Sequence, residues 1–327
     1  MNPSTSAYTY WDGPGAQRTA PGRGIPFGSS SVQHGTAVFE GIRCYATPEG
    51  PALFRLDDHL LRLLNSARLL GIHHDHDLRR LRAATLRAAA ESGFADAYVR
   101  PGLFAADPIL SIDLSTVPFT LGIEVWAMAA PPAEAGEGRT SAVAPVPGVR
   151  LTVSPWRRPS PETFPPRAKA VGTYVTSALA KTAAVTAGFD DALQLDCVTG
   201  RIAEATVSNV FLVTDGRLRT PWLTDSLLAG ITRDTVLTLA RDLGLEVAEG
   251  PVEVSDVRAA QEVFLTGTAS ELVPVASLEG RPYARERPVF DAIAAAFRAT
   301  VTGHARHPEW RTPVPAAVPD QPAAVTS

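Results

Sequence analysis

Residues 152–184 read TVSPWRRPSPETFPPRAKAVGTYVTSALAKTAA, in which a proline-rich loop leads into an alanine-rich helix. Four prolines between positions 159 and 166 restrict the backbone before Lys169, and Gly172 relaxes it just after. This arrangement holds one amine at a junction of loop and helix, where catalytic groups are often found. A lysine placed there could form a Schiff base with a carbonyl cofactor, although this stretch alone fits a surface lysine better.

Composition excludes several classes of protein. The 327 residues are enough for two domains, and 45% hydrophobic with 20% charged residues is typical of a globular protein. A net charge of −4 offers no basic surface for nucleic acid. No apolar run reaches the roughly 18 residues of a membrane span, and the N-terminus does not resemble a signal peptide. Cys44 and Cys197 cannot build a disulfide framework, so we expect a cytoplasmic protein. From the charge and the lack of a long apolar run, we expect no nucleic-acid or membrane partner.

The first part of the chain alternates predicted strands with two predicted helices. The strands are expected at residues 7–13, 31–46, 51–56, 97–104 and 121–129. One helix is capped by Asp57 or Asp58 and runs to Gly71, with an apolar stripe at helical spacing. The other follows Asp77 and stops at Gly93.

The second part repeats this alternation after a segment rich in proline, glycine and charge at residues 131–148, which we interpret as a linker. Helices are predicted at 173–187, 232–244 and 288–301, between short strands. These patterns predict two α+β or mixed α/β domains, at residues 1–130 and 149–303. A proline- and alanine-rich tail, residues 304–327, is predicted to be disordered.

Several residues in the second part are candidates for binding or catalysis. Glu204 fits an ordinary carboxylate at a strand end, but it could also pair with a protonated pyridine nitrogen and keep that ring cationic. The stretch Gly230-Ile231-Thr232 begins a helix, where free N–H groups attract phosphate, or Thr232 is only an N-cap. The turn at residues 267–269 also suits an anion.

Other candidates have simpler local interpretations. Arg62 lies roughly opposite the apolar stripe of its helix and fits a solvated arginine. Arg100 comes from a strand and fits either a surface ion pair or a bidentate carboxylate site. The histidines at positions 73, 74 and 76 fall in a short loop without a second ligand group, so we predict no metal site.

The order of the motifs along the chain is more specific than any one of them. The motifs, in chain order, are VFEGIRCY (38–45), FRLDDHLLRL (54–63), YVRP (98–101), PPRAKAVGTY (165–174), EATVSNVF (204–211), AGITRD (229–234) and FLTGTASEL (264–272). This order resembles the branched-chain aminotransferase family, class IV enzymes of fold type IV that use pyridoxal 5′-phosphate. The resemblance spans about residues 8–302 and implies a small α/β sandwich domain and a larger α/β pseudo-barrel domain.

The resemblance implies a cofactor site. Lys169 matches the lysine that holds pyridoxal 5′-phosphate as a Schiff base and serves as the catalytic base. Glu204 matches the partner of the pyridine nitrogen, and Tyr174 matches a tyrosine near the phenolic oxygen. The remaining positions that match cofactor-binding residues are Arg62, Asn209, Ile231, Thr232 and Thr268.

The resemblance also implies a substrate site. Tyr98 with the Thr268-Ala269 turn matches the site of the substrate α-carboxylate, and Arg100 matches the arginine that meets the side chain of glutamate. Phe39 matches part of an apolar pocket. The implied reaction moves an amino group between an apolar L-amino acid and 2-oxoglutarate by a ping-pong mechanism, in a homodimer or higher homo-oligomer.

Three departures from the family pattern fall on the substrate side. His34 stands where the family usually has a tyrosine supplied by the neighbouring subunit, and Ser208 stands where several members have glutamate. Residues 126–136, WAMAAPPAEAG, lack the second aromatic residue expected of a loop over the pocket. The sequence therefore leaves open a specialised substrate, a D-amino-acid or amine transaminase, an aminodeoxychorismate-type lyase, or a cofactor-binding protein without activity.

Overall fold

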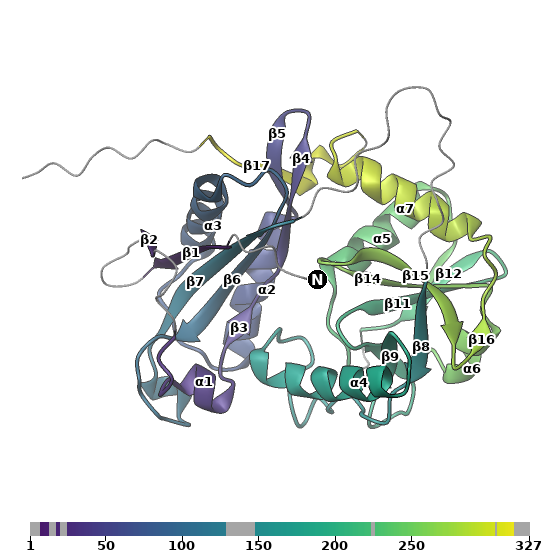
Figure 1. Cartoon of the computed structure of the whole chain (residues 1–327), viewed down its shortest axis with the longest axis horizontal. Coiled ribbons are helices and arrows are strands. Elements are labelled where there is room, and N and C mark those ends of the chain that lie inside the picture. Colours follow the sequence, from purple (N-terminus) through teal and green to yellow (C-terminus); the bar gives the residue numbers. More distant parts are fainter. Residues whose placement is uncertain are drawn as a thin grey trace, which may run out of the picture.

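A computed structural model describes residues 7–12, 18–19, 25–128, 148–223, 226–304 and 306–316. Two sheets lie side by side, each accompanied by its own helices (Figure 1). The first sheet is built from strands before residue 128 together with one strand from the C-terminal end, and the second from strands after residue 148. Of the linker predicted at 131–148, residues 131–147 lie outside the described residues.

The first sheet is antiparallel in the order β17-β5-β4-β6-β7-β1-β2, with β3 also paired to β6. Its strands are β1 (Ala7–Asp12), β2 (Arg18–Thr19), β3 (Val38–Phe39), β4 (Ile42–Thr47), β5 (Gly50–Phe54), β6 (Ala97–Ala105), β7 (Phe119–Ala127) and β17 (Arg311–Pro313). The helices α2 (Leu56–Leu69) and α3 (Leu78–Ser92) cover one face of it.

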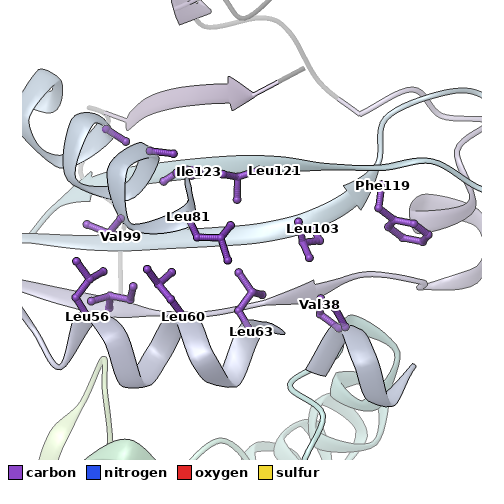
Figure 2. Close-up of a cluster of buried hydrophobic side chains, with 14 of the residues drawn as sticks. Val38, Leu56, Leu60, Leu63, Leu81, Val99, Leu103, Phe119, Leu121 and Ile123 are labelled. Atoms are coloured by element: carbon purple, nitrogen blue, oxygen red, sulfur yellow. The ribbon is translucent and has the colours of Figure 1, made fainter. Parts of the chain in front are cut away.

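Helix α2 has two different buried faces. Leu60, Leu63 and Ala67 are fully buried at helical spacing and pack against β6, β7 and α3 (Figure 2). Burying each of the two leucine side chains contributes about 1.5–3 kcal/mol. Helix α3 is capped as predicted, because the Asp77 side chain accepts from the Arg80 amide and Gly93 ends the helix at a φ of 69°. Both predicted helices are therefore confirmed, but the predicted cap of α2 is wrong, because Arg55 is its N-cap residue and Asp57 and Asp58 lie inside its first turn.

The second sheet follows the order β10-β9-β8-β15-β14-β11-β12-β13, with β16 paired to β15. Because β10, at one end of this order, packs against β11 and β12 near the other end, the sheet curls into a partial barrel. Its strands are β8 (Val149–Val153), β9 (Asp191–Leu195), β10 (Ile202–Ala205), β11 (Asn209–Thr214), β12 (Arg217–Pro221), β13 (Val247–Gly250), β14 (Glu262–Gly267), β15 (Glu271–Leu278) and β16 (Arg281–Pro282). The accompanying helices are α4 (Tyr174–Thr186), α5 (Ile231–Asp242), α6 (Val254–Ala259) and α7 (Pro288–Val301).

Some local predictions were wrong. Residues 30–34, predicted as the start of a strand, form the short helix α1 (Ser30–His34). The Ser29 side chain caps it by accepting from the Val32 amide, and Gly35 ends it at a φ of 69°. Strands β10 and β13 and helix α6 were not predicted, because each is too short to show a period.

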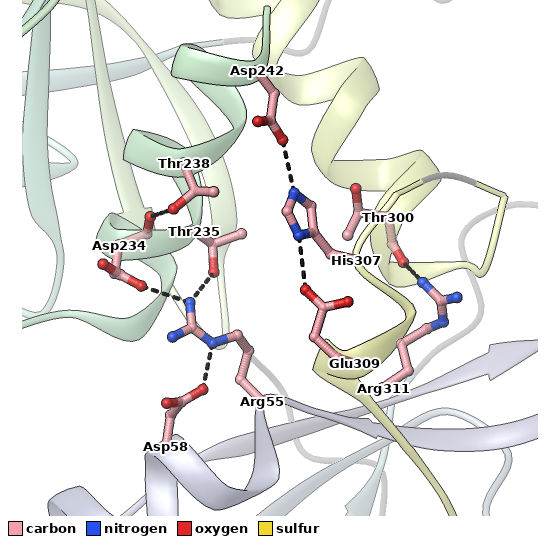
Figure 3. A network of polar contacts seen from close by, with 10 residues as sticks. All are labelled: Arg55, Asp58, Asp234, Thr235, Thr238, Asp242, Thr300, His307, Glu309 and Arg311. Atoms are coloured by element: carbon pink, nitrogen blue, oxygen red, sulfur yellow. Dashed lines mark hydrogen bonds and ion pairs between the residues drawn. The ribbon is translucent and has the colours of Figure 1, made fainter.

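The C-terminal end corrects the prediction of a disordered tail from residue 304. Residues Pro308–Trp310 form a 3-10 turn, and β17 extends the first sheet by pairing with β5. The Trp310 ring meets Phe54 edge-on with centroids 6.0 Å apart, and stacks on the His307 ring at 3.9 Å. His307 also bonds to Asp242 on α5 and to Glu309 (Figure 3). The segment is ordered because its aromatic ring and its backbone both find partners, which composition does not reveal.

Among the helices in the described part of the chain, none is long and apolar enough to cross a membrane.

Candidate active site

An open cavity of about 580 Å³ lies where the two sheets face each other. Arg62 of α2 lines it from the first sheet's side. From the second sheet's side it is lined by the lysine loop, the beginnings of α4 and α5, and the ends of β10, β11 and β14. Segments far apart in the sequence therefore meet at one site, which is where ligands usually bind between two units of a fold.

Lys169 is held by the first sheet and by α2. Its backbone amide donates to the Ser66 hydroxyl at 3.0 Å, and its carbonyl accepts from the Phe39 amide at 3.1 Å. Its side-chain amine donates to the Tyr174 hydroxyl at 2.8 Å. Burial alone would lower the pKa of this amine, but Tyr174 and Glu40 outweigh burial and raise it.

Glu204, on β10, is a buried carboxylate with three donors around it. Arg158 pairs with Oε1 at 3.1 Å, while the Asn209 side chain and the Leu228 amide donate to Oε2 at 3.2 and 3.3 Å. Burial raises the pKa of Glu204, and Arg158 and the Leu228 amide oppose that rise. Burial still disfavours the negative charge of Glu204. A cationic group placed beside this carboxylate would therefore stabilise that charge and be stabilised by it.

The N-terminus of α5 opens onto the cavity without a capping side chain. Gly230 is the N-cap residue, and Gly230, Ile231 and Thr232 all line the cavity. A Cβ atom at position 230 would lie 1.9 Å from the Asn209 Oδ1 atom, so a larger residue there would displace the Asn209 side chain. The free amides and the helix dipole of the first turn make this a site for an anion.

Only 11% of the Arg62 side chain is exposed, which makes its local interpretation as a solvated arginine wrong. It donates through Nε and NH2 to the Glu40 carboxylate, at 2.6 and 2.8 Å, and through NH1 to the Ala229 carbonyl at 2.7 Å. Ala229 immediately precedes the N-cap of α5. Arg62 therefore joins the first sheet's helix to the anion-binding end of α5.

The turn after β14 supplies a second polar wall. Gly267 and Thr268 line the cavity, and so does the hydroxyl-bearing Thr266, which is 1% exposed. The Thr266 Oγ1 atom is buried without a hydrogen-bond partner among the described residues. A buried hydroxyl without a partner is costly unless a ligand or water meets it.

On the substrate side, aromatic and cationic side chains are stacked. The centroids of the Phe39 and Tyr174 rings are 5.0 Å apart. The Lys169 amine lies 5.2 Å from the centroid of the Phe39 ring, and the Arg100 guanidinium lies 4.0 Å from the same centroid. We find no ion pair of Arg100 within the described ranges. Tyr98 is packed against Gly41, where an added Cβ would lie 1.9 Å from its hydroxyl.

The structure brings most of the predicted site residues together, but it separates some. Lys169, Tyr174 and the residues predicted to bind the cofactor all line the cavity; the set is Arg62, Glu204, Asn209, Ile231, Thr232 and Thr268. Phe39, Tyr98, Arg100 and Ala269 do not line it directly, although Phe39 packs against Tyr174. His34 ends α1 with an exposed side chain that does not line the cavity. Ser208 lines it and is buried.

Sequence reasoning missed Glu40, His59, Arg158 and Thr266. Glu40 had a signal, because a single carboxylate stands in the apolar run VFEGI. His59 shares a helix face with Arg62 and Ser66 at the spacing of i, i+3 and i+7, which marks a second, polar buried face. Arg158 and Thr266 have no such local signal.

An amine, a buried carboxylate and an uncapped helix N-terminus around one cavity are the arrangement expected of a pyridoxal-phosphate enzyme. A family model described as Amino-transferase class IV matches residues 37–278. The chain belongs to the class IV aminotransferases, and it is a transaminase that uses pyridoxal 5′-phosphate.

Relatives and solved structures agree with this family. The chain is 34% identical over 285 residues to a branched-chain-amino-acid aminotransferase of Pseudomonas aeruginosa, covering 86% of this chain and 90% of the relative. It is 37% identical over 277 residues to that of Escherichia coli strain K12, covering 84% and 87%. A branched-chain aminotransferase structure from Thermoproteus uzoniensis aligns with a TM-score of 0.84 at 33% identity, covering 94% of this chain and 99% of the other. These matches confirm the predicted fold, a mixed α/β fold of type IV with one curled sheet.

The residues of the cavity fit pyridoxal 5′-phosphate. The uncapped N-terminus of α5 suits its phosphate, and Glu204 suits a protonated ring nitrogen. The unpartnered Thr266 hydroxyl indicates a place where a ligand atom could bond. Within the described residues, no cluster of His, Cys, Asp and Glu suited to a metal ion is found.

Proposed function

We propose that this transaminase transfers the amino group of a branched-chain or similarly apolar L-amino acid to 2-oxoglutarate. The observation that carries the proposal is the stack of Phe39 and Arg100 beside Lys169, which offers an apolar surface and a guanidinium next to the same amine. The names of the relatives from Pseudomonas aeruginosa and Escherichia coli support the choice of branched-chain substrates. The Thermoproteus uzoniensis structure was determined with norvaline, which is also an apolar amino acid.

When bound, pyridoxal 5′-phosphate supplies a carbonyl that captures the amino group and a ring that withdraws electrons from the α-carbon. In our proposal Lys169 first holds the cofactor and then, once released, moves the substrate's α-proton as a neutral amine. The Tyr174 hydroxyl, 2.8 Å from that amine, orients it. Glu204 holds a proton on the ring nitrogen, with Arg158 and Asn209 fixing the carboxylate.

Separate groups of residues anchor the cofactor and the substrate in this proposal. Arg62 with the amides and hydroxyl of Ile231, Thr232 and Thr268 binds the phosphate. Tyr98 and the Thr268-Ala269 turn bind the α-carboxylate of the substrate. One pocket must then accept either an apolar side chain or the carboxylate of glutamate. A guanidinium stacked on an aromatic ring serves both, since Arg100 can pair with a carboxylate while Phe39 contacts an apolar chain.

The test is a half-reaction followed by absorbance. Purified protein loaded with pyridoxal phosphate is mixed with L-glutamate, L-leucine, D-glutamate, D-alanine and a primary amine without a carboxylate. We expect L-glutamate and L-leucine to convert the cofactor to its amine form. Conversion by the D-amino acids or by the amine, but not by L-glutamate, would replace this function by another class IV reaction.

We further propose a homodimer or higher homo-oligomer. Phe27, Leu110 and Ile112 are 83%, 68% and 76% exposed, and their segments adjoin because the Ser30 hydroxyl donates to the Ser111 carbonyl. Large exposed apolar side chains gathered in this way are typical of an interface. His34 lies on the same segment, and we propose that it reaches the neighbouring subunit's pocket. Gel filtration with light scattering measures the assembly, and a monomer would contradict this part.

Two further parts of the proposal concern the whole chain. We propose a cytoplasmic enzyme. Cys44, which is buried, and Cys197, which is exposed, are both free thiols without a disulfide bond, as expected in a reducing compartment. We also keep the division into a small domain at residues 1–130 and a larger cofactor-binding domain at 149–303 as a proposal, supported by the two separate sheets. Limited proteolysis whose first cuts fell inside either range, and not in the segment 131–148, would contradict that division.

A further inference from the structure

Glu40 is a buried carboxylate that the reaction described above does not use. It lies between β3 and β4 with 0% exposure, and its amide donates to the Pro101 carbonyl at 2.7 Å. Its two oxygens accept from Arg62, and Oε2 also accepts from His59 Nδ1 at 2.7 Å. A carboxylate is taken out of water at such a place only when several donors surround it.

The donors of Arg62 can be counted. A guanidinium has five N–H groups in a fixed plane. One on Nε and one on NH2 are used by Glu40, and one on NH1 is used by the Ala229 carbonyl. This leaves one N–H on each terminal nitrogen for an anion at the start of α5. Their direction is fixed by the plane of the guanidinium, and the bidentate contact with Glu40 fixes that plane.

His59 fixes the carboxylate in turn. The ring is 1% exposed, and burial lowers its pKa although Glu40 acts in the opposite direction. Burial alone would raise the pKa of Glu40, but Arg62 and His59 hold it well below its usual range. Because Glu40 is therefore ionised and can only accept, the neutral His59 ring must donate from Nδ1. The three residues form one chain of hydrogen bonds from α2 through Glu40 and back to α2.

We propose that Glu40 and His59 are positioning residues, which hold the Arg62 guanidinium in the one orientation that meets the 5′-phosphate of the cofactor. This inference rests on the proposed role of Arg62 and α5 in binding phosphate. Its effect is on the affinity for the phosphate group and not on the chemistry at Lys169.

A purely electrostatic role of Glu40 makes the opposite prediction. Glu40 offsets the charge of Arg62, so its removal adds a positive charge beside a phosphate dianion and would tighten binding. Positioning predicts weaker binding, because a released guanidinium must be ordered again when the phosphate arrives. The sign of the change in affinity therefore distinguishes the two roles.

The experiment compares two ligands with the full-length apoprotein, pyridoxamine 5′-phosphate and pyridoxamine, by isothermal titration calorimetry. Neither ligand forms a bond to Lys169, so only contacts with the ligand are measured. In Glu40→Gln, whose side chain has the same shape, we expect the affinity for the phosphorylated ligand to fall about 10-fold or more. We expect the affinity for pyridoxamine to change by less than about 2-fold, because this ligand has no phosphate for Arg62 to meet. Pyridoxamine is therefore the control for a general loss of structure, which would weaken the binding of both ligands.

Variants at position 59 test the second half of the proposal. In His59→Asn the amide N–H₂ group stands near the place of Nδ1 and still donates, so we expect affinity close to wild type. In His59→Phe the donor is lost, and we expect a loss of the same kind as in Glu40→Gln. The proposal is overturned if Glu40→Gln binds the phosphorylated ligand equally well or more tightly, or if both ligands weaken together.

Arg62→Met separates failure of this inference from failure of the phosphate site itself. If Arg62→Met loses affinity for the phosphorylated ligand while Glu40→Gln does not, Arg62 binds phosphate without help and only the inference fails. If Arg62→Met leaves the difference between the two ligands unchanged, the proposed phosphate role of Arg62 fails as well. Thermal unfolding of each apoprotein variant, measured in parallel, shows which of them are folded.

Discussion

On the cofactor side of the cavity, the charged groups are tied to one another, whereas on the substrate side they are loosely held. Glu204 is met by Arg158 and Asn209, and Arg62 is met by Glu40. Arg100, by contrast, lies on the Phe39 ring with no ion pair found in the described ranges. A buried charge is fixed by such partners, while a guanidinium on an aromatic face can turn at little cost.

The difference has a chemical reason. The cofactor is the same in every cycle, so rigid partners for its phosphate and ring nitrogen are an advantage. The two substrates differ, one being apolar and the other a dicarboxylate, so the groups that meet their side chains must serve both. The resemblance assigned the departures at His34 and Ser208 to the substrate, and of these two only Ser208 lines the cavity. In the proposed assignment, the fixed residues set the reaction type and the loosely held ones choose the substrate.

The largest expected effect comes from Lys169→Ala on the cofactor side. Loss of the only proposed base should lower kcat by about 10²–10⁴-fold, as expected for removing one acid–base group. Lys181→Ala is the matched control, since Lys181 is about half exposed and, among the described residues, bonds to Asp190 and Asp191. Transaminase assays with L-leucine and 2-oxoglutarate measure both. A Lys169→Ala enzyme with normal turnover would show that the two sides have been assigned wrongly.

A smaller and selective effect is expected from Arg100→Met, which keeps the length of the side chain on Phe39 but removes the charge. We expect kcat/KM for 2-oxoglutarate to fall about 10–100-fold, the value of one charge-assisted pair, and kcat/KM for L-leucine to change little. Arg150→Met, on the exposed arginine of β8 that pairs with Asp190, should change neither. Equal losses with both substrates would mean that Arg100 supports the fold and does not read the side chain.

The smallest effect is expected far from both sides, in the C-terminal segment. Asp242 and Glu309 raise the pKa of His307, with partial burial acting against them, so the folded protein binds this proton more tightly than the unfolded chain. The stabilisation is complete below the unfolded pKa and is lost as pH rises through the higher folded pKa. In His307→Phe, which retains stacking on Trp310, Tm should fall by about 1–2 °C near pH 5.5 and by less near pH 9.

Differential scanning calorimetry at the two pH values measures this change. A decrease in Tm that is larger at high pH would contradict the ion pairs of His307. Activity should be unchanged in this variant, since the segment does not line the cavity.

Much of the fold could be predicted from local patterns. Helices α2, α3 and α7 carry long apolar periods with recognisable ends, and β11 is a continuous apolar run. The segment at 306–316 could not be predicted, because Trp310 and β17 gain their stability only from Phe54 and the edge of a sheet formed far earlier in the chain. Helix α1 was missed because five residues are too few to show a period.

The site divides in the same way. Lys169, Glu204 and Thr232 occupy local contexts that also fit ordinary structural roles, and only the order of the motifs gave them chemical roles. Arg62 was misjudged locally, since nothing in its helix reveals that Glu40 lies across from it. Arg158 could not be connected with Glu204 from sequence, because helix α4 and strand β9 lie between them along the chain and only folding joins them.

The central claim is that Lys169 is the residue that carries the cofactor. The chain has only two lysines, Lys169 and Lys181. Reducing the loaded enzyme with borohydride and mapping the modified peptide by mass spectrometry therefore gives a direct answer. We predict one phosphopyridoxyl group, on Lys169, which persists in Lys181→Ala and is absent from Lys169→Ala. A label on Lys181, or an unlabelled enzyme that is fully active, would contradict the account.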